Sequence, residues 1–130
     1  MSPFLKKGEL LSGKKEIDIL FNTGRSFSIY PFRVIYEIQR KPGANGTVVL
    51  FSVPKKRFSK AVHRNSLKRK MREADRLNKN LLTDATSSSD IHLSLAFVYT
   101  GNELKEFSEI EHKIILSLNR LVKEYEKLVT

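Results

Sequence analysis

The 130-residue chain contains no cysteine, so neither disulfides nor thiolate metal ligands can hold its fold together. Long apolar runs are absent too: nowhere do about 18 apolar residues stand together, as a membrane span requires, and Met1–Gly8 lacks the apolar segment of a signal peptide. We therefore expect a soluble, cytoplasmic protein with no membrane partner. Apolar residues make up 40% of the chain, enough for one core, so we expect a single domain over residues 1–130.

Acidic residues are scarce, at 14 against 24 Lys and Arg, and they are dispersed. Nucleases that use two metal ions need several carboxylates converging on one pocket. The aspartates instead fall on separate segments: Asp18, Asp75, Asp84 and Asp90. His63 could be drawn as a general base, but no orienting carboxylate is evident and the other histidines are remote in sequence. We predict no catalytic residue and no metal site in the protein, and a stand-alone endonuclease is disfavoured.

The positive charge is concentrated in one segment. Residues 55–79 contain eleven Lys and Arg against two acidic residues, a net charge of +9 out of the chain's +10. Basic patches of this kind attract the phosphates of nucleic acids whatever their sequence. A polyanion is therefore the expected partner.

Residue patterns predict an alternation of helices and strands. Helices are expected through residues 14–21, from about 59 through 81, and from 108 to 128, and strands over 25–30, 32–38, 47–53 and 91–99. The order is helix, three strands, helix, strand, helix. This order predicts an α/β (α+β) two-layer sandwich.

Local signals refine these boundaries. Ser12 and Ser108 are expected N-caps, Gly24 a C-terminal stop, and 41–46 a turn. The polar segment 83–90 is expected to be a flexible connector. Apolar positions at helical spacing predict the packing faces: Ile17, Leu20 and Phe21; Leu67, Met71, Ala74, Leu77 and Leu81; and Ile110, Ile114, Leu118, Leu121, Tyr125 and Leu128.

Within the basic segment, four cations recur every four residues: Arg64, Lys68, Arg72 and Arg76. They should form a row along one side of the helix, with Arg69 beside it. A charge run is usually a solvated face stabilised by interleaved acids. Almost none interleave here, which favours a nucleic-acid surface. The predicted strands carry the aromatic residues Phe27, Tyr30, Phe32 and Tyr36. Such rings can stack on unpaired RNA bases, although aromatic residues on strands more often belong to the core.

The basic helix, Lys60-Ala-Val-His-Arg-Asn-Ser-Leu-Lys-Arg-Lys-Met-Arg-Glu73, and the preceding Ser52-Val-Pro-Lys-Lys56 resemble the signature of the bacterial ribonuclease P protein family. The likeness in length and element order runs from about Leu10 to Leu128, with its specific part between Ser52 and Arg76. It implies a protein subunit that binds the ribonuclease P RNA and the single-stranded 5′ leader of precursor tRNA. Hydrolysis would belong to the RNA, which would hold most of the Mg²⁺, and no obligate protein partner is implied.

The resemblance also implies residue roles. The residues that would face the catalytic RNA are Arg64, Asn65, Lys68, Arg69 and Arg72, with Lys55, Lys56 and Lys60 as adjoining contacts. A groove between the first helix and the sheet would hold the leader, lined by Phe21, Ile17, Phe32 and Tyr36. The Asn65 amide oxygen is a candidate ligand of hydrated Mg²⁺, although a hydrogen-bonding role is the better interpretation. The family further implies a mixed four-stranded sheet with a left-handed crossover into its last strand, against the general rule.

Two positions depart from the family pattern. Ser66 stands where the family usually has an Arg, so a forked phosphate contact is missing or is supplied by a neighbour such as Lys70. Ile17 stands where an aromatic is frequent. The alternative function is a ribosomal or architectural RNA-binding protein with no role in cleavage.

Overall fold

Residues 14–40, 46–86 and 91–129 are described by the structure, a computed structural model. The elements in chain order are α1 (Lys14–Thr23), β1 (Arg25–Ile29), β2 (Phe32–Arg40), β3 (Gly46–Ser52), α2 (Ala61–Asn78), α3 (Asn80–Thr86), β4 (Ile91–Tyr99) and α4 (Phe107–Val129). This order confirms the predicted one, with α3 added. The expected cap at Ser12 and residues 41–45 of the expected turn lie outside the described residues.

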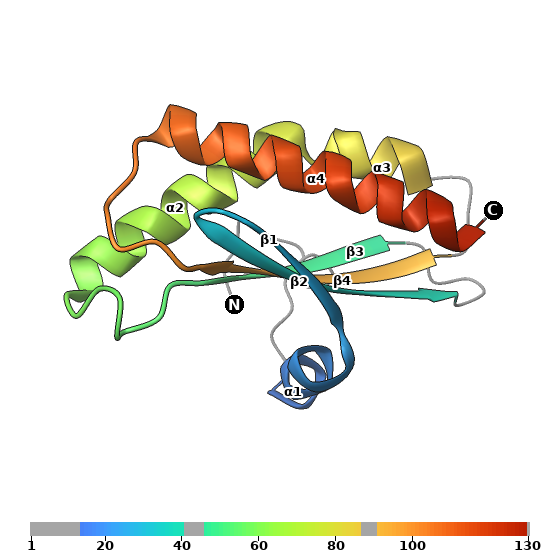
Figure 1. Cartoon of the computed structure of the whole chain (residues 1–130), viewed down its shortest axis with the longest axis horizontal. Coiled ribbons are helices and arrows are strands. Elements are labelled where there is room, and N and C mark those ends of the chain that lie inside the picture. The colour runs from blue at the N-terminus through green and yellow to red at the C-terminus, as the bar shows by residue number, and fades with distance from the viewer. Residues whose placement is uncertain (1–13, 41–45, 87–90, 130) are drawn as a thin grey trace.

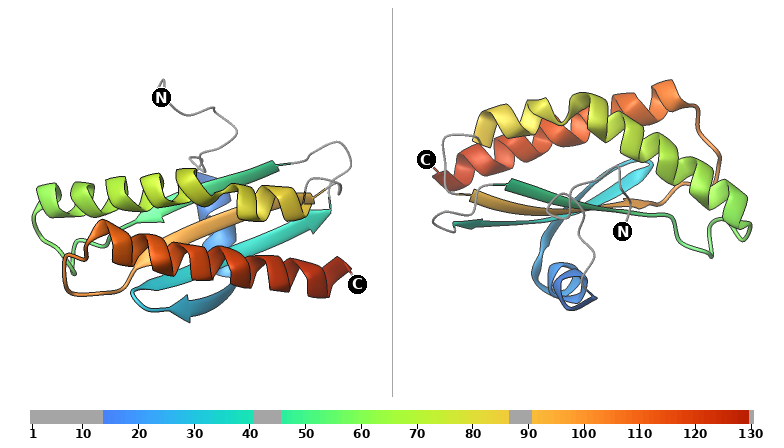
Figure 2. Two further views of the ribbon diagram at one scale, coloured as in Figure 1. Left: turned by 90° about the horizontal axis from the view of Figure 1, so that it is seen from above. Right: turned by 180° about the vertical axis from the view of Figure 1, so that it is seen from behind.

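The four strands form one mixed sheet in the order β1-β2-β4-β3. The β1/β2 and β2/β4 pairs are antiparallel, whereas β3 and β4 run parallel. Helices α2, α3 and α4 cover one face, and α1 lies on the other (Figure 1). Seen from the helix layer with β3 and β4 pointing up, β4 lies to the left of β3 (Figure 2, left). The connection is therefore left-handed, contrary to the usual rule.

Alternation along the strands sorts side chains into two cores. The helix-side core includes a group of aromatic rings: Phe32 lies edge-on to Phe97 and Tyr99, with centroids 6.1 and 5.7 Å away, and Phe51 stacks on Phe97 at 5.8 Å. On the opposite face, a smaller core joins α1 to the sheet through Leu20, Ile35, Val48 and Ala96. Both cores are apolar, so each stabilises its layer by removing hydrocarbon from water.

Gly24 ends α1 as predicted and also allows the close approach of α1 to β2. Its N–H donates to the Leu20 carbonyl at 2.8 Å. A Cβ at Gly24 would lie 2.5 Å from that carbonyl oxygen and 3.0 Å from Ile35 Cγ2. Any larger residue would therefore push α1 away from the sheet.

The long basic helix is interrupted, which the periodicity of its apolar residues did not predict. Leu67, Met71 and Ala74 are buried as expected, but α2 ends at Asn78, and a separate helix, α3, begins at Asn80. Leu77 (49%) and Leu81 (37%) are exposed, and Leu82 is buried instead. Residues 83–86 of the expected loop are helical, and Thr86 is buried. The prediction was wrong on these positions.

The last helix begins earlier than Ser108. Ile110 N–H donates to the Glu106 carbonyl at 3.1 Å, so the helical hydrogen bonding already starts there and Ser108 lies inside α4. Five of the six predicted core positions of α4 are buried. Leu128 is exposed, because the helix runs past the sheet before it ends.

Candidate nucleic-acid interface

The loop that leads into α2 presents the first cations of the basic segment. Lys55, Lys56 and Lys60 are exposed, and within the described chain no acidic partner is recorded for them. Arg57 is instead occupied, since its guanidinium donates to Asn102 Oδ1 at 3.0 Å. This bond ties the loop before α2 to the loop after β4. The three lysines therefore project from a fixed base.

Arg64 does not point outward as the four-residue spacing suggests. Its Nη1 donates to the backbone carbonyls of Phe58 and Ser59, both at 2.8 Å. Lys60, the N-cap of α2, makes no side-chain capping bond. Arg64 therefore fastens the preceding loop onto the first turn of the helix, and only the rest of its guanidinium fork is available to RNA.

We expect Arg64→Ala to lower the free energy of unfolding by about 1–2 kcal/mol, because it removes hydrogen bonds from a charged donor to two carbonyls. Arg69→Ala, an exposed position on the same helix, should stay within about 0.5 kcal/mol of the parent. Urea unfolding of the free protein measures both. Equal midpoints for the two variants would mean that the Arg64 contacts contribute nothing to folding.

The outward face of α2 lies opposite the buried stripe of Leu67 and Met71. It carries Asn65, Arg69 and Arg72, all exposed, with half-buried Lys68 on its flank. No ion pair is recorded for these cations anywhere in the described ranges. Like charges on neighbouring turns repel one another, and a bound polyanion relieves that repulsion.

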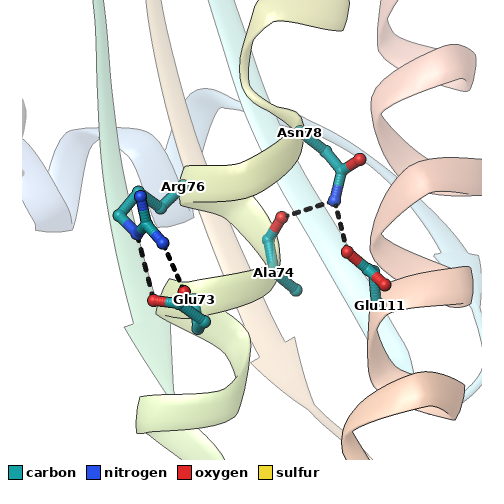
Figure 3. Close-up of polar contacts among 5 residues, drawn as sticks. All are labelled: Glu73, Ala74, Arg76, Asn78 and Glu111. Atoms are coloured by element: carbon teal, nitrogen blue, oxygen red, sulfur yellow. Dashed lines mark hydrogen bonds and ion pairs between the residues drawn. The ribbon is translucent and has the colours of Figure 1, made fainter.

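The C-terminal end of α2 is electrically different. Arg76 Nε donates to Glu73 Oε2 at 3.0 Å, and this contact lowers the pKa of the Glu73 carboxyl (Figure 3). On the other side of the helix, Asn78 Nδ2 donates to the Ala74 carbonyl at 2.8 Å and to Glu111 of α4 at 3.0 Å. The predicted row of four cations is thus occupied at both ends. Within the described ranges, the members of the row without a recorded partner are Lys68 and Arg72, with Arg69 beside them.

Ser66 is half-buried, and Lys70, the neighbour suggested as a replacement for the family's Arg, is held elsewhere. The Lys70 ammonium donates to the Lys105 carbonyl at 2.9 Å, just before α4. That contact fixes its charge against the helix layer.

On the opposite face of the sheet, the two flanks of α1 look in different directions. Leu20 is buried, with Ile17 and Phe21 on one side of it and Thr23 on the other. The Thr23 hydroxyl donates to the Ile19 carbonyl at 2.7 Å and to Glu37 at 3.1 Å, so its flank faces the second half of β2. The flank with Ile17 and Phe21 faces the start of β2.

Apolar side chains of that flank and of the adjoining sheet form a partly exposed strip, which we call the α1 strip: Ile17, Phe21, Leu50 and Val98. Ile17, Leu50 and Val98 pack around the smaller core, and Phe21 is 41% exposed. The two first residues were predicted for the leader groove. Leu50 and Val98 were missed, although their alternation with buried Val49 and Phe97 was a usable signal.

The prediction that Phe32 and Tyr36 also line the groove is wrong. They belong to the helix-side core, with 0% and 5% of their surface exposed. Because neighbouring residues on a strand face opposite ways, Ile35 rather than Tyr36 faces α1. Burial, followed by the nearby Glu124 carboxylate, raises the pKa of Tyr36, whose hydroxyl donates to that carboxylate at 3.4 Å.

The remaining strand aromatics are also unsuited to stacking on that face. Phe27 lies on the helix side, with the Arg120 guanidinium 5.0 Å from its ring centroid. Tyr30 is 57% exposed, but it lies in the turn between β1 and β2. Of the predicted aromatics, Phe21 is therefore the one that is exposed at the α1 strip.

Comparisons with known proteins agree with this geometry. The family model described as Ribonuclease P matches residues 5–125. The ribonuclease P protein component of Porphyromonas gingivalis is 41% identical over 117 residues, covering 90% of this chain and 85% of that protein. The Chlorobaculum tepidum component is 38% identical, with the same coverage. The RNase P protein from Thermotoga maritima has a similar fold, with a TM-score of 0.66 and 23% identity over 86% of this chain and 96% of that one.

The chain belongs to the ribonuclease P protein family. It is accordingly a protein subunit of the ribonucleoprotein that forms the 5′ ends of tRNA, and the hydrolytic step belongs to the RNA subunit. The predicted family is confirmed, and the reading as a ribosomal or architectural protein is not supported.

Metal-binding side chains do not gather in the described part of this ribonuclease P protein. No three His, Asp or Glu residues there are arranged to hold a metal ion. Asn65 is exposed on the outward face of α2, and a single amide oxygen does not make a site. None of the described helices is long and apolar enough to span a membrane.

Proposed function

We propose that the outward face of α2, with the loop before it, binds the ribonuclease P RNA. The observation that carries this proposal is the position of the cations that lack a recorded acidic partner in the described chain. These cations lie on the loop before α2 and on the outward face of the helix: Lys55, Lys56, Lys60, Lys68, Arg69 and Arg72. By contrast, Arg64 is turned toward backbone carbonyls and Arg76 is neutralised by Glu73. Asn65 lies among them and can donate or accept hydrogen bonds. Phosphate contacts from such a face position an RNA without reading its sequence.

The α1 strip binds the single-stranded 5′ leader of precursor tRNA. Its exposed ring, Phe21, offers a stacking surface for one base, and Ile17, Leu50 and Val98 offer apolar contact. None of these side chains carries a directional hydrogen-bonding group, so the strip should accept leaders of many sequences. Support also comes from its place on the sheet, because the chain runs within five residues from Leu50 on β3 to Lys55 in the loop before α2.

The Mg²⁺ ions of the reaction are held mainly by the RNA, and the assembly works in the cytoplasm. In this arrangement the protein neutralises backbone charge and holds the substrate. It supplies no group to the bond that breaks.

The test is a cleavage assay with purified protein, a bacterial ribonuclease P RNA and precursor tRNAs whose leaders differ in length, at low Mg²⁺. We expect cleavage to require the RNA, and the protein to tighten substrate binding only when the leader spans several nucleotides. Phe21→Ala should reduce this leader-dependent gain roughly tenfold, the value of one base stacked on an aromatic ring. A gain that is independent of leader length would remove the leader assignment, and RNA binding without any effect on cleavage would remove the functional one.

A further inference from the structure

The sheet face that carries α1 has two ends of opposite charge character. At one end, a row of side chains crosses all four strands in the paired register: Ser28, Arg33, Val98 and Ser52. At the other end, four residues further along β2, the equivalent position is Glu37. The smaller core with Leu20 and Ile35 separates the two.

Arg33 is the cation of the first end. It is exposed, and no hydrogen bond or ion pair is recorded for it within the described ranges. Val98 is its neighbour on β4, so the guanidinium rises beside the α1 strip. Ser52, two strands away in the same row, is followed after two residues by Lys55. Arg33 and the lysines of the loop before α2 therefore lie toward the same end of the sheet.

Glu37 marks the second end with negative charge. Its carboxylate accepts hydrogen bonds from Thr23 of α1 at 3.1 Å and from Gln39 at 2.5 Å. These contacts fix an anion on the flank of α1 that faces away from Ile17 and Phe21. A phosphate laid along that flank would meet a like charge held in place, which is unfavourable.

An exposed Arg on a strand is ordinarily a solvated side chain. Arg33 differs in two respects. It borders a partly exposed apolar strip on its own face of the sheet, and it lies at the end of the sheet from which the chain continues to Lys55. An RNA strand needs this combination, because its bases seek apolar or aromatic surface while its backbone seeks cations.

We propose that Arg33 binds a phosphate of the leader and that Glu37 excludes the leader from the other flank of α1, so that the strand has one route over this face. This inference rests on the proposed binding of the leader at the α1 strip. In this proposal, the phosphate contact of the Arg33 guanidinium replaces part of the leader affinity that an aromatic residue at position 17 would provide.

The experiment compares Arg33→Ala, Arg33→Lys and Arg40→Ala in the assembled ribonucleoprotein. Arg40 is an exposed cation at the far end of the same strand, so its replacement is a matched change of charge. Affinity is measured for precursor tRNA and for tRNA without a leader. We expect Arg33→Ala to weaken binding of the leader-bearing substrate roughly tenfold, which corresponds to the loss of one charge-assisted hydrogen bond. Its affinity for leaderless tRNA should be unchanged. Arg33→Lys should recover part of the loss, and Arg40→Ala should lose nothing.

A second measurement locates the contact. Leader phosphates are replaced one at a time by uncharged methylphosphonates, and the loss of affinity is measured with the parent and with Arg33→Ala. One phosphate should matter to the parent and no longer to the variant, as expected for two groups that interact directly. If each methylphosphonate weakens binding equally with the parent and with Arg33→Ala, Arg33 contacts no leader phosphate. The role of Arg33 is also overturned if Arg33→Ala weakens binding of leaderless tRNA as much as binding of precursor tRNA. If the ribonucleoprotein assembled with the parent protein bound precursor tRNA and leaderless tRNA equally well, the proposed function itself would be overturned.

Discussion

Replacing Lys68, Arg69 and Arg72 together by Ala is expected to weaken binding of the ribonuclease P RNA by about a thousandfold near physiological salt. Each charge-assisted contact to phosphate contributes roughly 1.5–3 kcal/mol, and every tenfold in affinity corresponds to about 1.4 kcal/mol. The three side chains carry no recorded acidic partner in the described chain, so their full charge is available to the RNA. The dependence of affinity on salt should flatten as well, because fewer counterions are released on binding.

Arg76→Ala is the matched control for this charge surface. It removes a cation from the same helix, but one that Glu73 already neutralises, so RNA binding should change less than threefold, which is about 0.6 kcal/mol. Filter binding or fluorescence titration from low to high salt measures both proteins. If Arg76→Ala weakens binding as much as replacing one of the three unpaired cations, affinity follows total charge and the outward face has no special role.

The second large effect concerns stability. Phe32→Ala should lower the free energy of unfolding by about 3–5 kcal/mol, because the ring is fully buried among Phe97 and Tyr99 and its removal leaves a cavity. That is a large part of the roughly 5–15 kcal/mol that stabilises a typical domain. Phe21→Ala should cost no more than about 1 kcal/mol, since this ring is already partly in water. Urea unfolding measures both.

Phe32→Leu separates packing from recognition. It retains most of the buried hydrocarbon, so the protein should remain folded, and leader binding should equal that of the parent. Phe21→Ala should show the reverse pattern, with near-parent stability and weakened leader binding. A folded Phe32→Leu variant that loses leader affinity would restore Phe32 to the substrate-binding surface.

Much of this protein was determined by local sequence. The order of helices and strands followed from apolar periodicity and from breakers such as Gly24, because these act through neighbours along the chain. The family followed from the residues between Ser52 and Arg76, and the proposal that α2 binds RNA followed from its charge. The α4 core positions were predicted for the same reason, since a helix presents every third or fourth residue to one side.

Tertiary structure decided what depends on the environment of a side chain. The face on which Phe32 and Tyr36 lie depends on strand register and on which layer covers each face, and an aromatic residue fits a core as well as a binding surface. Arg64 and Arg76 have the same charge as Arg69 and Arg72, but their nearby carbonyls and carboxylate occupy them, and those partners become neighbours only once the loop and helix have formed. Leu82 is buried whereas Leu77 and Leu81 are exposed, a difference that depends on how α2 and α3 pack against α4. Composition and periodicity thus determined the helices, the strands and the polyanionic class of the partner. Long-range packing selected the side chains that remain available to contact that partner.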